Sequence, residues 1–215
     1  IIREASLISA YSKTQSLLTD IGQNVYENIS AIIARPNFDE VELKRRVPEE
    51  ISVLRRNLIT RIKEDLQTGN READRQTEIN EILAIPHDPT EHSIPQPKVI
   101  DVYVRRGTDE WFFDLKTVKL NLDGEPKFKE QLLQWIAREN REINAMMVFP
   151  YNPYDPEPFE TRFTMRGILG RNEYMVGQEY WDFLGGPGAY PQVLEIFDQV
   201  GREHWDELNH LMTGN

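Results

Sequence analysis

Residues 99–116 read VIDVYVRRGTDEWFFDLK, and this stretch decides the fold. Two runs within it, 99–104 and 111–116, are rich in β-branched and aromatic residues, which predicts two strands. Residues 106–109, Arg-Gly-Thr-Asp, stand between the runs and are typical of a hairpin turn. The stretch therefore predicts an antiparallel hairpin.

The register of this hairpin follows from its apolar residues. Positions 100, 102 and 104 are apolar and share one face of the first strand, and positions 111, 113 and 115 share one face of the second. If both sets are to reach one core, Val104 must lie opposite Trp111, and positions 102 and 100 opposite 113 and 115. The same register sets Asp101 across from Asp114, with Lys116 two residues along on the same face. The pattern thus predicts a cluster of two carboxylates and one ammonium.

Such a cluster suits the hydrolysis of a phosphodiester. Two neighbouring carboxylates repel each other strongly unless a cation lies between them, and their oxygens are the ligands that Mg²⁺ prefers. Bound Mg²⁺ can generate a nucleophile from water, and a nearby lysine can orient that water or neutralise charge on the phosphate. The alternative is a cross-strand ion network on a solvated face. Against that alternative, Val99, Tyr103 and Phe112 share the charged face, and charges among apolar neighbours need a specific reason.

The segments before the hairpin are expected to be helical. Apolar residues recur at helical spacing from Leu17 to Ile33 and again from Ile51 to Leu66, where Gly69-Asn70 ends the helix. A shorter helix is expected over about 71–83, followed by a proline-rich connector that runs to Pro97. Residues 1–97 are therefore predicted to form a helical N-terminal region and connector.

The segments after the hairpin alternate between helix and strand. The pattern predicts a helix over 126–140, a buried strand over 144–149, a proline-rich loop over 150–158, another possible strand over 162–165, and a helix from Pro191. Hairpin, helix and strand in this order predict a mixed α/β fold, in which a central mixed sheet is flanked by helices over residues 98–215.

Composition limits the partners of the chain. The 215 residues suit one core domain with or without a helical appendage, and the absence of cysteine excludes disulfides and thiolate zinc sites. No stretch approaches the roughly 20 apolar residues of a membrane span, so no membrane partner is expected. The formal net charge of −11 argues against a polyanion, but from 116 to 141 six basic residues stand against four acidic ones. The local balance still allows an anion site.

Several motifs together resemble a known family. Asp101 and, after twelve residues, Asp114-Leu115-Lys116 have the D…(D/E)-x-K form of the PD-(D/E)xK nucleases, with isoleucine where the name has proline. With FDLKTVK at 113–119, QLLQW at 131–135, PYNPY at 150–154 and WDFLGG at 181–186, the region from about 100 to 198 is similar to TdeIII-type type II restriction endonucleases. The resemblance is looser over the N-terminal helices.

The resemblance implies a restriction-endonuclease-like core and Mg²⁺-dependent hydrolysis of double-stranded DNA at a short specific site. Asp101 and Asp114 would be the metal ligands and Lys116 a catalytic residue, in a prokaryotic cytoplasm beside a cognate DNA methyltransferase. Related nucleases often place a glutamine on the following helix, which gives Gln131 a supporting catalytic role, or else that residue only borders the core. Some supply a further acidic ligand from an earlier helix, where Glu78 and Glu81 stand; both are otherwise ordinary surface glutamates.

A second subunit is expected from the symmetry of the reaction, and contacts to DNA are expected from residue type. Cutting two antiparallel strands at one short site is most simply done by a two-fold symmetric homodimer, with the N-terminal helices as part of its interface. The alternative function is a non-catalytic DNA- or protein-interaction domain whose acidic strand cluster is structural. Base reading is expected between 150 and 188. The candidate DNA-binding residues are Lys119, Asn121, Asn152, Arg162, Arg166, Arg171 and Gln178.

Overall fold

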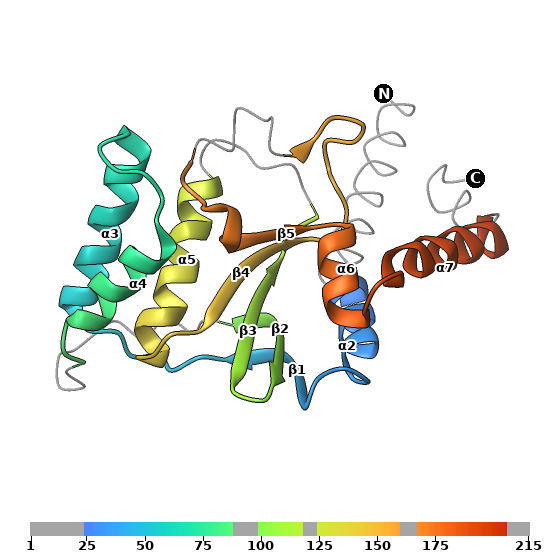
Figure 1. Ribbon diagram of the computed structural model, residues 1–215, viewed down its shortest axis with the longest axis horizontal. Coiled ribbons are helices and arrows are strands. Elements are labelled where there is room, and N and C mark those ends of the chain that lie inside the picture. The colour runs from blue at the N-terminus through green and yellow to red at the C-terminus, as the bar shows by residue number, and fades with distance from the viewer. Residues whose placement is uncertain (1–23, 88–98, 118–123, 160–166, 206–215) are drawn as a thin grey trace, which may run out of the picture.

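The computed structural model describes residues 24–87, 99–117, 124–159 and 167–205, and these form a mixed α/β structure around one sheet (Figure 1). The predicted fold class is confirmed. The five strands lie in the order β1-β2-β3-β4-β5. Their bounds are β1 (Glu40–Arg46), β2 (Val99–Arg106), β3 (Asp109–Leu115), β4 (Asn144–Phe149) and β5 (Tyr174–Val176).

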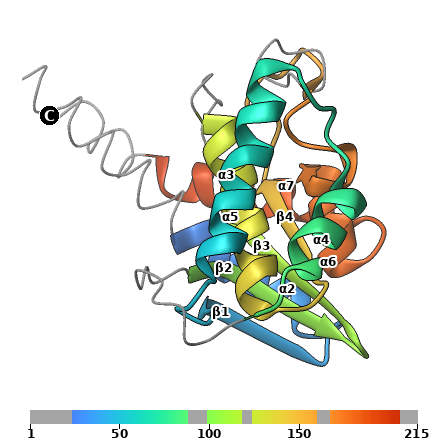
Figure 2. The same cartoon turned by 90° about the vertical axis from the view of Figure 1, so that its left-hand side faces the viewer.

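Helices cover both faces of this sheet. On one side lie α3 (Val53–Thr68), α4 (Arg75–Ala84) and α5 (Gly124–Glu139), and the other labelled helices lie on the opposite side (Figures 1 and 2). Those others are α2 (Tyr26–Ala34), α6 (Gln178–Gly185) and α7 (Ala189–Glu203). Among the described helices, none has the length and apolar character needed to cross a bilayer.

Each face of the sheet has its own hydrophobic core. On the α5 side the ring centroids of Phe112 and Trp135 lie 6.3 Å apart. On the α6 side the ring centroids of Phe113 and Tyr180 lie 5.4 Å apart. Consecutive residues of β3 thus enter different cores, as expected of a strand that is buried on both faces. A charged side chain on such a strand is surrounded by protein.

The hairpin of β2 and β3 has the predicted register. Val104 pairs with Trp111 and Val102 with Phe113 in antiparallel strands. The expectation that Ile100 shares a face with Val102 is wrong, because Ile100 packs in the core on the α5 side. The irregularity lies opposite Lys44 of β1, whose φ of 55° is left-handed and which is missing from the otherwise regular β1–β2 pairing. The alternation of side chains therefore breaks at the start of β2.

Most predicted helices and strands are found, and three elements were missed. Ser52 caps α3 by accepting a hydrogen bond from the Arg55 N–H, and Gly69 ends that helix with a φ of 73°. The strands β1 and β5 and the helix α6 were not predicted, and β1 lies within the region expected to be helical. The strand expected over 162–165 falls outside the described residues.

The direction of the strands brings the ends of several strands to one edge of the sheet. The helix α5 joins β3 to β4, which are parallel, and β5 is parallel to β4. The ends of β3, β4 and β5 therefore lie at the same edge as the beginning of β2, which runs antiparallel to β3. Asp101, Asp114 and Lys116 all lie at this edge.

Candidate active site

Asp114 is buried, with 5% of its surface exposed. Its Oδ1 accepts a hydrogen bond of 2.9 Å from Nε2 of Gln131, which α5 brings over the end of β3. Its Oδ2 lies 2.7 Å from Nζ of Lys116 but accepts no well-oriented hydrogen bond from the described residues. Burial raises the pKa of the Asp114 carboxyl, an effect that Lys116 opposes and Asp101 reinforces.

Asp101 lies beside this group, and both of its carboxylate oxygens are engaged. Oδ2 accepts a hydrogen bond of 2.9 Å from the backbone N–H of Leu115, the residue between Asp114 and Lys116. Oδ1 accepts a hydrogen bond of 2.9 Å from Nζ of Lys44. The carboxylate thus ties the start of β2 to the end of β3. The predicted cluster of Asp101, Asp114, Lys116 and Gln131 is brought together.

Two further charged residues at this site were not predicted. Glu27 of α2 and Lys44 of β1 form an ion pair of 2.6 Å, and the same Nζ contacts Asp101. Burial raises the pKa of the Glu27 carboxyl, with Lys44 opposing and Asp101 adding to the effect. Burial lowers the pKa of the Lys44 ammonium, but its hydrogen bonds to Glu27 and Asp101 outweigh this, and the pKa is raised. The site therefore contains three carboxylates and two lysines.

The position of Glu27 explains why it was missed. The helix α2 buries Glu27, Ser30, Ala31 and Ala34, which share one face, whereas Ile32 of the more apolar stripe is 63% exposed. Small residues allow the helix to approach the sheet closely, which brings the glutamate against Lys44. The spacing of Glu27 with Ala31 and Ala34 was the available signal, but the larger apolar residues of the same helix obscured it.

The donor set fits Mg²⁺ better than a metal that needs a ready-made cage. Within residues 24–87, 99–117, 124–159 and 167–205, no three histidine or acidic side chains are arranged to hold an ion together. Magnesium is usually held by one or two carboxylates and keeps several waters or substrate oxygens. Oδ2 of Asp114, buried and without a well-oriented hydrogen bond, is the oxygen that a cation would satisfy.

Glu78 and Glu81 are engaged elsewhere. Glu78 is fully buried in an ion pair with Lys129 of α5, and Lys129 also contacts Glu173. Glu81 accepts two hydrogen bonds from the guanidinium of Arg71, at 2.9 Å and 3.0 Å. Both carboxylates therefore have basic partners other than the lysines around Asp101 and Asp114.

The predicted DNA-binding residues are placed only in part. The amide of Asn152 is used within its own loop, since it donates to the Glu157 carbonyl and accepts from the Tyr154 N–H. Gln178 begins α6 directly after β5, at the edge where β3 and β4 also end. Arg171, on a short 3₁₀ turn before β5, pairs with Glu179 at 2.9 Å. The remaining candidates, Lys119, Asn121, Arg162 and Arg166, lie outside the described residues.

The same edge gains one contact that the sequence did not indicate. The hydroxyl of Tyr151, which follows β4, donates a hydrogen bond of 2.6 Å to the backbone carbonyl of Thr117. This bond holds the start of the loop after β4 beside the residues that follow Lys116. The loop expected to carry base-reading residues is therefore adjacent to the acidic cluster.

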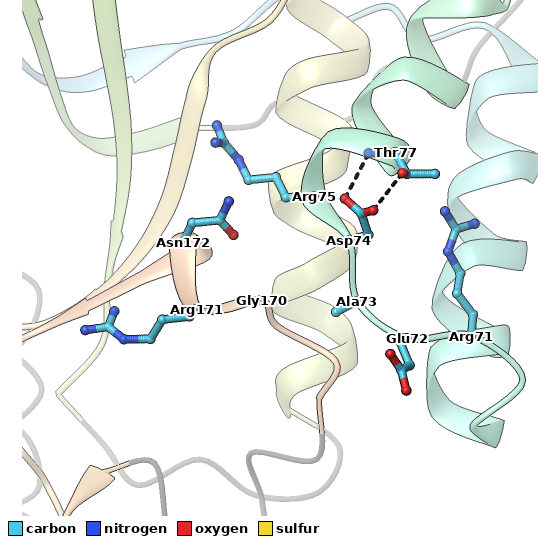
Figure 3. A pocket seen from close by; sticks show the side chains of 9 residues that line it. All are labelled: Arg71, Glu72, Ala73, Asp74, Arg75, Thr77, Gly170, Arg171 and Asn172. Carbon is cyan, nitrogen blue, oxygen red and sulfur yellow. Dashed lines mark hydrogen bonds between the residues drawn. The ribbon is translucent and has the colours of Figure 1, made fainter.

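A separate cavity of about 630 Å³ lies between the start of α4 and the 3₁₀ turn before β5 (Figure 3). Three arginines line it, but their guanidinium groups already have partners: Arg71 pairs with Glu81, Arg75 donates to the Ile143 carbonyl, and Arg171 pairs with Glu179. The charges of Arg71 and Arg171 are therefore neutralised by glutamates, whereas Arg75 has a neutral carbonyl partner.

Comparisons with known proteins identify the family. Three type II restriction enzymes from Herpetosiphon aurantiacus are similar to part of the chain. HgiEI is 27% identical over 107 residues, 47% of this chain and 39% of the relative; HgiBI is 26% identical over 107 residues with the same coverage. HgiCII is 27% identical over 114 residues, 50% of this chain and 42% of the relative. The matched region spans about two fifths of these relatives.

No solved structure matches the chain. The family described as type II restriction endonuclease, HinfI, matches residues 4–201, which includes every described helix and strand except the end of α7. The match therefore covers both the sheet and the helices that bring Glu27 and Gln131 to the acidic cluster. This chain belongs to the HinfI family of type II restriction endonucleases.

Proposed function

We propose that this chain is a type II site-specific deoxyribonuclease that hydrolyses phosphodiester bonds of double-stranded DNA with Mg²⁺ at Asp101 and Asp114. The observation that carries the proposal is the buried Asp114, whose Oδ2 lies 2.7 Å from Lys116 and accepts no well-oriented hydrogen bond from the described residues. Its place beside Asp101 supports a centre of the PD-(D/E)xK type. The family supports the reaction class, and the TdeIII-type resemblance is the finer part of the proposal.

Each side chain has a role that follows from its contacts. Asp101 would hold the ion through Oδ1, because its Oδ2 accepts a hydrogen bond from the Leu115 N–H. Asp114 would hold it through Oδ2, because its Oδ1 accepts a hydrogen bond from Gln131. Bound Mg²⁺ would polarise a phosphate oxygen and make water a stronger nucleophile. Lys116 would orient that water or neutralise charge that develops on the phosphate. Gln131 positions Asp114 through its hydrogen bond.

The proposed assembly is a two-fold homodimer on double-stranded DNA, because such symmetry matches a palindromic site. The α2 helix supports a share in the interface, since its residue Ile32 and the preceding Val25 are exposed apolar side chains. A cognate DNA methyltransferase in a prokaryotic cytoplasm would complete the system. Base reading from the segment 150–188 is supported by the Tyr151 contact beside the acidic cluster.

A second function stays open because each carboxylate of the cluster has a lysine partner. Lys44 contacts Glu27 and Asp101, and Lys116 contacts Asp114. A network of this kind can be purely structural, in a DNA- or protein-interaction domain without catalysis. Such a domain would bind without cutting.

Digestion of a plasmid of known sequence separates the two functions. The wild-type chain with Mg²⁺ is expected to give a fixed set of fragments, and with Ca²⁺ to bind its site without cleavage, because Ca²⁺ keeps oxygen coordination with looser geometry. Asp114→Asn and Lys116→Ala should each lower the cleavage rate by about 100-fold to 1,000-fold or more, because charge stabilisation in the transition state is lost.

Asp198→Asn and Lys63→Ala are the matched controls, since each removes a charge from an ion pair elsewhere on the chain. Both controls should cut at the wild-type rate, and all four variants should keep the wild-type circular dichroism spectrum. A Lys116→Ala protein that cuts as fast as wild type would remove Lys116 from the centre. A wild-type chain that binds DNA but never cuts it would favour the interaction domain.

A further inference from the structure

Lys44 contacts one of the carboxylate oxygens that the proposed metal ion would need, Oδ1 of Asp101. Its Nζ lies 2.6 Å from Oε1 of Glu27 and 2.9 Å from Oδ1 of Asp101, so the ammonium bridges two carboxylates that belong to different elements. These carboxylates are only 5% and 17% exposed, whereas the lysine side chain is 48% exposed. The cation of this cluster is therefore its most accessible member.

The oxygens of Asp101 show what the ammonium displaces. Oδ2 is committed to the backbone N–H of Leu115 at 2.9 Å, so Oδ1 is the oxygen left for a metal. Lys44 takes this same oxygen. The ammonium and a divalent ion would thus compete for Oδ1, because two cations that contact the same oxygen repel each other at short range.

The backbone of β1 is bent where the side chain needs to reach the cluster. Lys44 has a φ of 55°, a left-handed conformation that is strained for a residue with a Cβ. The flanking pairs Leu43–Val102 and Arg45–Ile100 keep one register, so the strand pairing continues on both sides of Lys44. Such local strain is maintained by contacts of that residue, and those that the structure gives to the Lys44 side chain are the two ion pairs.

We propose that Lys44 is an internal counter-cation, which holds Glu27 and Asp101 together in the metal-free protein and leaves Asp101 Oδ1 when a divalent ion binds. The inference rests on the proposed metal site. The carboxylates are brought close before the metal arrives, because the ammonium offsets their repulsion. The metal in turn must displace a bonded lysine, which lowers its apparent affinity. The half-exposed side chain has room to move into solvent.

Metal binding without DNA tests this directly. Calorimetric titration with Mn²⁺, as a stand-in for Mg²⁺, is compared between the wild-type chain and Lys44→Met. Removing the competing ammonium should tighten Mn²⁺ binding by about fivefold to tenfold, as expected for the loss of two partly exposed ion pairs. Lys44→Gly should behave in the same way, because glycine tolerates the left-handed backbone and removes the ammonium.

Thermal unfolding gives a second readout. Without metal, Lys44→Met should unfold at a lower temperature than wild type, because buried Glu27 loses its partner, and saturating Mn²⁺ should restore more stability to the variant than to wild type. Lys63→Met removes a lysine that pairs with Glu130 at 2.6 Å, and should leave Mn²⁺ affinity unchanged.

Each result decides between the two proposals. If Lys44→Met and Lys44→Gly bind Mn²⁺ as wild type does, or more weakly, the counter-cation role is overturned while the metal site stands. If wild type shows no saturable Mn²⁺ binding, or Asp114→Asn binds as tightly as wild type, the proposed metal site and the role of Lys44 fall together.

Discussion

Two lysines of this protein each contact a pair of carboxylates, and their surroundings are opposite. Lys129 contacts Glu78 and Glu173 in a sealed cluster, in which every side chain is at most 2% exposed. Lys44 contacts Glu27 and Asp101 in an open cluster, in which the lysine is half exposed. The chemistry of the groups is the same, so burial is what separates them.

The side chains of the sealed cluster are held in fixed positions. Its carboxylates are also held by backbone groups, since Glu173 accepts from the Gly170 N–H at 2.6 Å and Glu78 from the Asp74 N–H at 3.3 Å. Lys129 thereby ties α5 to α4 and to the turn before β5. The open cluster borders Asp114, with its incompletely satisfied oxygen, and can exchange its cation. Enclosure makes one cluster a structural tie, and access makes the other a candidate reactive site.

The largest effect is expected from breaking the sealed cluster. Lys129→Met leaves two carboxylates buried without a cation, which should lower the free energy of unfolding by about 3–5 kcal/mol. Urea denaturation at neutral pH measures this. The matched control is Lys63→Met, whose pair with Glu130 is partly exposed and should contribute only about 0.2–1 kcal/mol.

Similar losses of stability in Lys129→Met and Lys63→Met would show that enclosure does not distinguish the clusters. In that case the contrast drawn from their exposure would have no energetic basis.

An intermediate effect is expected from the glutamine beside the open cluster. Gln131→Ala removes a 2.9 Å hydrogen bond to the Asp114 carboxylate, and such bonds to charged groups are worth about 1.5–3 kcal/mol. Single-turnover cleavage with Mg²⁺ should slow by about tenfold to 100-fold, with a wild-type circular dichroism spectrum. Gln134→Ala is the control on the same helix, because Gln134 bonds Glu130 instead. Equal losses in the two variants would reduce Gln131 to a packing residue.

The smallest effect is a pH dependence of stability from Glu78. Burial raises the pKa of this carboxyl above its ordinary value near 4.5, although Lys129 opposes the shift. The folded state therefore binds the proton more tightly than the unfolded state. The contribution of Glu78 to the free energy of unfolding should rise as pH falls from neutral through its folded-state pKa. This gain should be complete once the pH is below its pKa in the unfolded state.

Glu78→Gln removes the titrating group, so the gain on acidification should be smaller than in wild type. Glu81→Gln changes a more exposed glutamate of the same helix, and it should keep the full gain in the free energy of unfolding on acidification. Urea denaturation at several pH values measures both. A wild-type slope retained in Glu78→Gln would assign the pH dependence to another group.

The sequence predicted the parts of the site that local pattern controls. Asp101, Asp114 and Lys116 come together because the apolar residues of the hairpin fix its register from Val102 to Phe113. The helical period predicted α5, and the resemblance to related nucleases, rather than the pattern itself, singled out Gln131 on it. In the hairpin, hydrophobic burial determines where the polar residues go.

The rest of the site depends on tertiary contacts that no local pattern contains. Lys44 occupies a left-handed conformation in a short charged strand, and nothing in the residue type indicates it. Glu27 is brought in because α2 packs through Ala31 and Ala34, while the larger Ile32 stays exposed. The close approach of α2 to the sheet thus determines which of its side chains are buried, rather than their size. The shift of Ile100 to the other core accompanies the same irregularity of β1.

The bend at Lys44 also affects how the sheet meets other proteins. β1 is the outermost strand on its side of the described sheet, and an edge strand offers unpaired backbone groups to any passing chain. Five of its seven residues are charged, and its backbone turns left-handed at Lys44, so a foreign strand finds neither a flat nor an apolar edge. The same lysine that bridges two carboxylates therefore also discourages edge-to-edge aggregation.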